Sequence, residues 1–331
     1  MPTFFVTIPG TTIRCENHLF VAEAPGQPRV SVPEFRVEAI VAFGAAHLTH
    51  AAIARVLARH TPVYWLTRYG RPLGMLVPAY DTRADVRLAQ FRRHEDAAAG
   101  LDFARAVVTA KVRHARGFLQ RYQRNHPTAP LEPGITALAE ALEHVARAAS
   151  VASLRGHEGA AAHTYFAALR HLLPAELFDG RSRRPPLDPA NALFSLGYTL
   201  LGWEICGLLC AAGLDPCLGH LHATRRGLPA LAQDLLEIFR TPVVERWAIA
   251  LLHHRVVGMD DFCAGPGQAM RLSKAALPRV LQSYEAALQE TFTRRDGQVT
   301  DFRRILAAEI RHLRHWYAGT DPYTPFHWER G

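Results

Sequence analysis

The sequence is poor in lysine, in cysteine and in long apolar runs. Only Lys111 and Lys274 among its 38 basic residues are lysines, so arginine carries almost all of the positive charge. Five cysteines in 331 residues, without the spacing of a disulfide framework, indicate a reduced, cytoplasmic protein. No run reaches about 18 uninterrupted apolar residues, and the N-terminus lacks the basic start of a signal peptide. We therefore expect neither a transmembrane helix nor secretion.

The composition is that of a folded, basic protein. Hydrophobic residues make up 49% of the chain, which is ample for a sizeable core, and the formal net charge is +8. A positive protein suits a polyanionic partner, either nucleic acid or an acidic membrane surface. Because arginine so outnumbers lysine, part of the excess can reflect compositional bias, and charge alone does not decide for nucleic acid.

The hydrophobic period changes once along the chain. Over residues 1–78, short β-branched and aromatic runs alternate with Pro and Gly turns, which predicts a small sheet domain with one helix at 45–59. Residues 79–85 form the expected linker. Over residues 86–331 the apolar residues recur at helical spacing. The predicted fold class is α+β, a small N-terminal β-rich domain followed by a larger all-α domain.

Four local signals predict elements or their boundaries. A single strand is expected over Ile13–Val21. Gly100 is expected to separate two helices, with Asp102 as the N-cap of the second. The pair Thr241–Pro242 is expected to provide the N-cap and first residue of a new helix. A long, mostly apolar helix is expected over residues 191–212, and Gly213 is expected to end it in the left-handed conformation.

Four side chains carry the predicted chemistry. Glu158 stands among glycines and alanines, whose small size lets a backbone or a phosphate come close. Asp234 and Glu237 are three residues apart on an expected helix, which puts two carboxylates on one face. Carboxylates held that close repel each other, and a cation relieves the repulsion. With the imidazole of His222 they make a mixed oxygen and nitrogen set, which suits Mg²⁺ or Mn²⁺ better than a structural zinc.

A rival zinc site would use Cys206, Cys210, Cys217, His220 and His222. It is disfavoured because Cys206 and Cys210 lie four residues apart on an apolar helix, where a free cysteine behaves as a small core residue. The chain also has no C-x-x-C pair. A single D-x-x-E pair or a single loop histidine is more often an ordinary surface feature. The prediction of a metal site therefore rests on the four residues Glu158, His222, Asp234 and Glu237 taken together.

Arginine clusters flank the predicted site in sequence. Side chains of this kind neutralise DNA phosphates, although most such clusters are simply solvated faces. The DNA contacts that we expect are Arg181, Arg183, Arg184, Arg225 and Arg226.

The motifs resemble those of the CRISPR adaptation integrase–endonuclease family, whose members, with a small partner protein, insert new spacers into a CRISPR array. The motifs stand in the same order as in that family, and they extend over almost the whole chain. Its segments are 41–44, 66–74, 154–161, 183–198, 213–222 and 231–240. Two departures stand out. The Asn-Gln often found at the end of one family helix is Arg113–His114 here, and an extra residue separates Arg240 from Pro242.

The resemblance implies a divalent-metal-dependent DNA endonuclease and integrase, in which a DNA 3′-hydroxyl attacks a phosphodiester and prespacer DNA enters the array. It implies Glu158, His222 and Glu237 as ligands of Mg²⁺ or Mn²⁺, with Asp234 as a supporting carboxylate. The three small residues around Glu158, which are Gly156, Gly159 and Ala160, would let the other ligand segments approach.

The resemblance also implies partners and a prokaryotic, cytoplasmic location. The partners are double-stranded DNA, as prespacer and array, a second copy that dimerises through the β-rich domain, and a small ferredoxin-like protein that completes a heterohexamer. Two other functions stay open. One is a stand-alone structure-selective, metal-dependent DNA nuclease of repair, and the other is a catalytically silent DNA-binding scaffold.

Overall fold

The computed structural model describes residues 3–68, 70–78, 84–182, 185–224, 229–294 and 296–328. Its contacts divide the chain into two units. One holds residues 1–82 and 274–289, and the other holds residues 83–273 and 290–331. A β-rich start followed by a helical remainder confirms the predicted fold class. Helix α9 (Leu277–Gln289) comes late in the chain but belongs to the first unit.

The first unit contains two four-stranded sheets and helix α1 (His50–Ala58). One sheet has the order β1-β5-β7-β8, in which β8 alone is antiparallel to its neighbour, and the other has the order β4-β3-β2-β6. The strands are β1 (Thr3–Val6), β2 (Thr11–Glu16), β3 (Leu19–Glu23), β4 (Val30–Pro33), β5 (Ala39–Phe43), β6 (Ala46–Leu48), β7 (Val63–Leu66) and β8 (Pro72–Leu76). Every residue of β5 is buried, as expected of an inner parallel strand.

The single strand expected over Ile13–Val21 is wrong. The segment forms a hairpin of β2 and β3, in which Glu16 pairs with Leu19. The two residues between them, Asn17 and His18, have φ angles of 48° and 61°. Two successive left-handed residues make the tight turn that matches the twist of paired strands, and asparagine tolerates this conformation well.

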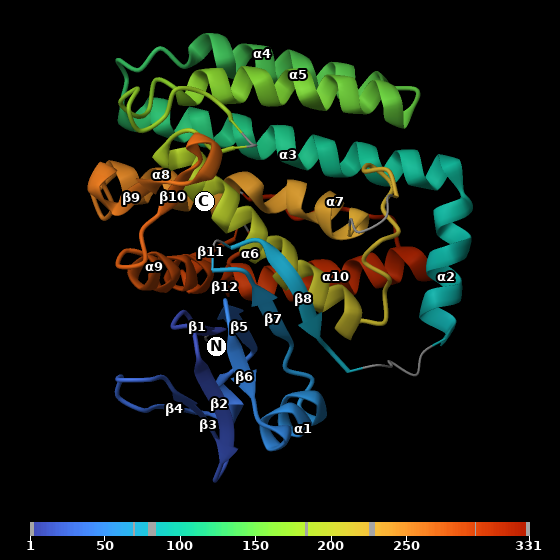
Figure 1. Ribbon diagram of the computed structural model, residues 1–331. Coiled ribbons are helices and arrows are strands. Elements are labelled where there is room, and N and C mark those ends of the chain that lie inside the picture. The colour runs from blue at the N-terminus through green and yellow to red at the C-terminus, as the bar shows by residue number, and fades with distance from the viewer. Residues whose placement is uncertain are drawn as a thin grey trace. The chain divides into compact units, whose positions relative to one another are not determined.

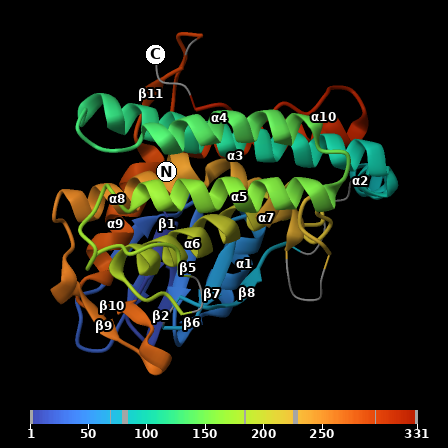
Figure 2. The same cartoon turned by 90° about the horizontal axis from the view of Figure 1, so that it is seen from above.

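The second unit is built from long helices. They are α2 (Ala84–Glu95), α3 (Ala97–Asn125), α4 (Glu132–Arg147), α5 (Val151–Leu169), α6 (Pro189–Ala211), α7 (Ala230–Phe239), α8 (Arg246–His253) and α10 (Phe302–Ala318). Helices α3, α4 and α5 run alongside one another (Figures 1 and 2). Two small hairpins depart from the all-helical expectation, β9 (Phe262–Ala264) with β10 (Met270–Leu272) and β11 (Phe292–Thr293) with β12 (Val299–Thr300).

Gly100 lies inside α3, so the helix boundary expected there is wrong. The break falls instead at Asp96, whose carboxylate accepts hydrogen bonds from the amides of Ala98 and Ala99, both at 3.0 Å. The glycine serves packing rather than termination. A Cβ at Gly100 would lie 3.0 Å from His220 Nδ1, so the missing side chain lets that histidine approach α3.

The new helix expected at Thr241–Pro242 does not begin there. The chain continues from α7 through a π-helical turn, η2 (Arg240–Glu245), directly into α8. The Thr241 hydroxyl does not cap a helix but donates to Glu245 Oε2 at 2.6 Å. A π turn closes i→i+5 hydrogen bonds and so holds one residue more than an α turn. It therefore accommodates the extra residue noted between Arg240 and Pro242.

Helix α6 forms part of the core of the second unit. Among the described residues it is the one helix long and apolar enough to cross a membrane, and 61% of the apolar window is buried within the fold. A buried core helix has the same composition, so this is weak support for a membrane span. The helix ends as predicted, with Gly213 at a φ of 78°.

Candidate metal centre

Asp234 anchors the histidine loop to helix α7. Its side chain is fully buried and accepts the backbone amides of His220 at 2.7 Å, Leu221 at 2.9 Å and His222 at 2.8 Å. Three amide donors offset much of the cost of burying a carboxylate. Gly219 makes the close approach possible, because a Cβ there would lie 2.7 Å from the carbonyl carbon of Ala230.

The same carboxylate orients His222. Asp234 Oδ1 lies 2.7 Å from His222 Nδ1, and because a carboxylate accepts, Nδ1 carries the proton. The second ring nitrogen, Nε2, then keeps its lone pair and lies 3.8 Å from Glu237 Oε1. In metal sites, a histidine usually donates one ring N–H to a carboxylate and coordinates the metal through its other ring nitrogen. His222 has this arrangement, with Asp234 as the carboxylate.

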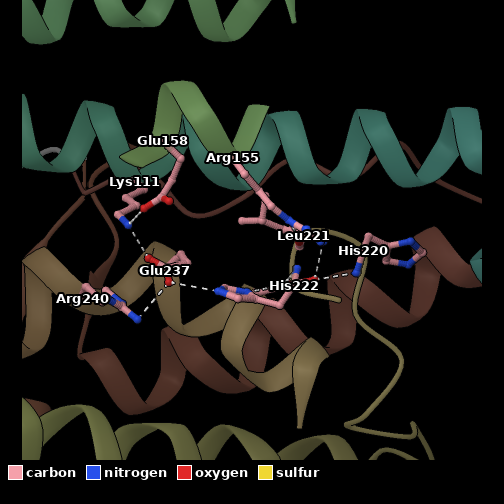
Figure 3. A network of polar contacts seen from close by, with 9 residues as sticks. Lys111, Arg155, Glu158, His220, Leu221, His222, Glu237 and Arg240 are labelled. Carbon is pink, nitrogen blue, oxygen red and sulfur yellow. Dashed lines mark hydrogen bonds and ion pairs between the residues drawn. The ribbon is translucent and has the colours of Figure 1, made fainter. Parts of the chain in front are cut away.

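Glu158 of α5 and Glu237 of α7 meet at Lys111 of α3. The ammonium group contacts Glu158 Oε1 and lies 2.6 Å from Glu237 Oε2. Figure 3 shows Lys111 between the two carboxylates, with Arg240 and His222 on the other side of Glu237. Arg240 Nη2 lies 2.9 Å from Glu237 Oε1. The two oxygens of Glu237 are thus divided between a lysine and an arginine.

Glu237 is held in its ionised form. Burial alone would raise its pKa, but the positive charges of Arg240 and Lys111, together with His222, outweigh burial and lower the pKa to about 2. Its Oε2 atom faces the ammonium of Lys111 at 2.6 Å. A buried, ionised carboxylate oxygen that already attracts a cation is a suitable ligand for a divalent ion.

The structure brings all four predicted residues into one network. Glu158, Lys111 and Glu237 form one side, and Glu237, His222 and Asp234 form the other. Within the described part of the chain, no three His, Cys, Asp or Glu side chains come close enough to form a complete metal site. The ammonium of Lys111 stands between two of the carboxylates instead. The donor types, two carboxylates and one imidazole nitrogen, fit Mg²⁺ or Mn²⁺.

Lys111 and Arg240 belong to the site, although no motif in the sequence predicts them there. The rarity of lysine was the one signal that could have singled out Lys111. Arg240 lies at the start of η2, and its guanidinium stacks over the ring of Tyr198 at 4.6 Å. The Tyr198 hydroxyl in turn donates to Glu245 Oε1 at 2.5 Å. The π turn therefore places Arg240 beside Glu237 on a well-packed support.

The interpretation of the small residues around Glu158 is wrong. Gly156, Gly159 and Ala160 are exposed, and a Cβ on either glycine would meet nothing within 4 Å. They do not admit the other ligand segments. The link between α5 and the histidine loop is made by Arg155, whose Nε donates to the carbonyl oxygen of Leu221 at 2.6 Å (Figure 3).

The one predicted DNA contact within the described residues is Arg181, and it is engaged by the fold. It donates to Asn191 Oδ1 at 2.5 Å and lies over the rings of Phe166 and Tyr198, both at 5.6 Å. Its role in DNA binding stays a prediction. The other four arginines lie outside the described residues, namely Arg183, Arg184, Arg225 and Arg226.

A basic groove of about 1040 Å³ lies along α3 and α4 and reaches Trp328. The arginines that line it are Arg113, Arg116, Arg121 and Arg124. Of the described residues in its lining, Glu132 alone is acidic. Arg113, Arg116 and Arg124 form no ion pair with any described residue, so the groove presents uncompensated positive charge.

Comparison with known proteins identifies the family. Residues 4–286 match the family described as CRISPR associated protein Cas1. The chain belongs to the Cas1 family. The chain is 36% identical over 330 residues to the CRISPR-associated endonuclease Cas1 3 of Thermus thermophilus, and the match covers 96% of this chain and 97% of that relative. The predicted resemblance is confirmed.

Two solved structures are similar to this Cas1 chain. A casposase bound to integration product superposes with a TM-score of 0.88 at 21% identity, over 100% of this chain and 94% of the casposase, which shows a shared fold. A chain of a Cas6-RT-Cas1–Cas2 complex superposes with a TM-score of 0.81 at 25% identity, over 99% of this chain and 36% of the other. The chain is therefore a Cas1 endonuclease homologue of CRISPR adaptation.

Proposed function

We propose that this protein inserts prespacer DNA into a CRISPR array by divalent-metal-dependent phosphodiester transfer, in which a DNA 3′-hydroxyl attacks a phosphodiester. The observation that carries the proposal is the convergence of Glu158, Glu237 and His222, from three separate segments, with Asp234 behind His222. Kinship with a Cas1 endonuclease supports the reaction class.

Each residue of the network has a part in this reaction. Glu158, Glu237 and His222 Nε2 would hold Mg²⁺ or Mn²⁺, which when bound supplies Lewis-acid polarisation of a phosphoryl oxygen and stabilises developing negative charge. Asp234 keeps the His222 proton on Nδ1 and fixes the ring. Arg240 keeps Glu237 ionised.

The proposed partners are double-stranded DNA, a second copy of the chain joined through the β-rich unit, and a small ferredoxin-like partner that completes a heterohexamer. The similarity to a chain of a Cas1–Cas2 complex supports the protein partner. For DNA, we propose that the groove along α3 and α4 contacts the phosphate backbone, because Arg113, Arg116 and Arg124 form no ion pair with any described residue.

Substitution of two proposed ligands tests the function. Glu158→Ala and His222→Ala should each abolish integration of prespacer DNA into a supercoiled array plasmid, assayed with Mn²⁺ and the partner protein. His163→Ala is the matched control, because His163 is exposed on the same helix as Glu158 and should not affect activity. All three variants should keep the wild-type circular dichroism spectrum.

Two results would redirect the proposal. Full integration by either ligand variant would refute the site. Metal-dependent cleavage of branched DNA without the partner, together with no half-site integration in its presence, would indicate a stand-alone nuclease instead.

A further inference from the structure

Lys111 contacts both carboxylates that we assign to the metal. It is one of two lysines among 38 basic residues, and its side chain is 12% exposed. Its partners come from different helices, since Glu158 lies on α5 and Glu237 on α7. A lysine therefore lies where arginine would be expected from the composition of the chain.

The chemistry of the two amino acids explains why lysine suits this place. An ammonium is a compact point charge on a flexible stem of four carbons, whereas a guanidinium is a planar fork. The nearby Arg240 shows the contrast, because its guanidinium is held between the ring of Tyr198, 4.6 Å from the centroid, and Glu237 Oε1 at 2.9 Å. The Lys111 ammonium contacts two carboxylates at once, as a bridging metal cation would.

The contacts also show which oxygens a metal ion would need. Arg240 pairs with Glu237 Oε1, while Lys111 pairs with Glu237 Oε2 and Glu158 Oε1. Arg240 thus leaves Oε2 as the Glu237 oxygen open to a cation, and a cation that bridges Glu158 and Glu237 through it would compete with Lys111 for that oxygen. Because two positive charges at one point repel each other, Lys111 and the ion exclude each other.

We propose that Lys111 competes with the divalent ion for Glu158 and Glu237 and so sets the metal affinity of the site. This inference rests on the proposed function, because it takes these carboxylates as metal ligands. Lys111 holds the two carboxylates together until the ion binds. The displaced ammonium stays tethered beside the site, where it can pair with the phosphate of a bound DNA.

The test is Mn²⁺ binding to the full-length protein, measured by titration calorimetry. Lys111→Met should bind Mn²⁺ roughly tenfold or more tightly than the wild type, a change of the size that groups around a metal usually produce. Without Mn²⁺ the variant should unfold at a lower temperature, and added Mn²⁺ should raise its Tm more than that of the wild type. Lys274→Met is the matched control, because Lys274 is the other lysine and is exposed.

Two further variants cover the case in which Lys111→Met fails to fold. Lys111→Gln keeps a hydrogen-bond donor without the charge and should also bind Mn²⁺ more tightly. Lys111→Arg keeps the charge and should bind Mn²⁺ no more tightly than the wild type.

Equal or weaker Mn²⁺ binding by the uncharged Lys111 variants, relative to the wild type, would overturn the competition. If neither the wild type nor any variant binds Mn²⁺, the competition and the metal assignment both fail. If the expected affinities are found but integration is absent, the proposed function fails while the role of Lys111 stands.

Discussion

At the scale of single residues, one buried carboxylate organises the histidine side of the site. Asp234 accepts three consecutive backbone amides and the Nδ1 proton of His222. It therefore fixes the loop, the tautomer and the ring with one side chain. An amide in its place could accept some of these bonds but would point its own N–H groups at a donor.

Asp234→Asn should for that reason weaken both folding and metal binding. We expect a loss of about 1–3 kcal/mol in the free energy of unfolding, because a buried donor loses its acceptor. We expect Mn²⁺ affinity to fall by roughly 10–100-fold, because the imidazole loses its orienting carboxylate. Urea unfolding and calorimetry measure the two effects. Asp102→Asn is the control, since the Asp102 side chain is 74% exposed.

The sequence predicts the acidic and imidazole members of this network but not the cations. Glu158, His222, Asp234 and Glu237 are residue types that metals bind, standing in a recognisable order. Lys111 could not be placed because its contact with Glu158 joins residues 47 positions apart on two different helices. Only packing of α3 against α5 brings them together, and no local pattern encodes that.

At the scale of elements, His114 links three segments of the second unit. Its Nδ1 donates to the carbonyl of Ile238 in α7 at 2.8 Å, and its Nε2 accepts the amide of Trp328 at 2.8 Å. Phe326 stacks on Phe239 beside this link, with the rings 5.9 Å apart. The residues after α10 thus brace the helix that carries Glu237. This is one of the two positions where the sequence departs from the Asn-Gln of the family.

His114 should make folding sensitive to acid. Burial lowers its pKa to about 3, and the charges of His327, Arg121 and Arg113 act in the same direction. Between about pH 6.5 and pH 3 the unfolded chain binds a proton here that the folded protein does not, so stability is lost as the pH falls. The loss from this residue is about 2 kcal/mol at pH 5, since each pH unit below 6.5 costs about 1.4 kcal/mol.

His114→Gln should remove that dependence. Urea unfolding at pH 7 and pH 5 should show a fall in the free energy of unfolding that is about 2 kcal/mol smaller in the variant than in the wild type. At pH 7 the variant should be less stable, because glutamine cannot reproduce both hydrogen bonds. An equal fall in both proteins would mean that His114 is protonated in the fold.

Element boundaries are predictable where their cause is local. The end of α6 at Gly213 follows from one left-handed residue, and the sequence predicts it. Gly100 misled the prediction because its reason is contact with His220, far away in sequence. The hairpin at Asn17 and His18 was missed because the flanking apolar residues look like one continuous strand.

At the scale of the whole molecule, positive charge should govern DNA affinity. The net charge is +8, and the groove along α3 and α4 gathers four arginines. Each phosphate contact contributes about −0.9 to the slope of log affinity against log salt. The triple variant Arg113→Ala, Arg116→Ala and Arg124→Ala should reduce the slope by up to about 3.

Fluorescence anisotropy with duplex DNA at several salt concentrations measures that slope. Arg147→Ala is the control, because Arg147 is exposed on α4 and is paired with Glu143. An unchanged slope in the triple variant would move the DNA away from the groove, towards the predicted contacts among residues 183–184 and 225–226.

Fold class and family could both be predicted from the sequence, because the change of hydrophobic period and the order of motifs extend over most of the chain. The grouping of α9 with the first unit could not. It depends on contacts between residues about 200 positions apart in sequence, which helical periodicity does not record.

The π turn at Arg240–Glu245 has a consequence for how Cas1 sequences are aligned. An extra residue in a loop leaves the helices on either side unchanged, whereas one within an α-helix turns all that follows by about 100°. Here the π turn accommodates the extra residue, so the same sides of α7 and α8 still face their packing partners. An alignment of this chain with its relatives should therefore place the gap inside a continuous helix, between Arg240 and Pro242, rather than in the nearest loop.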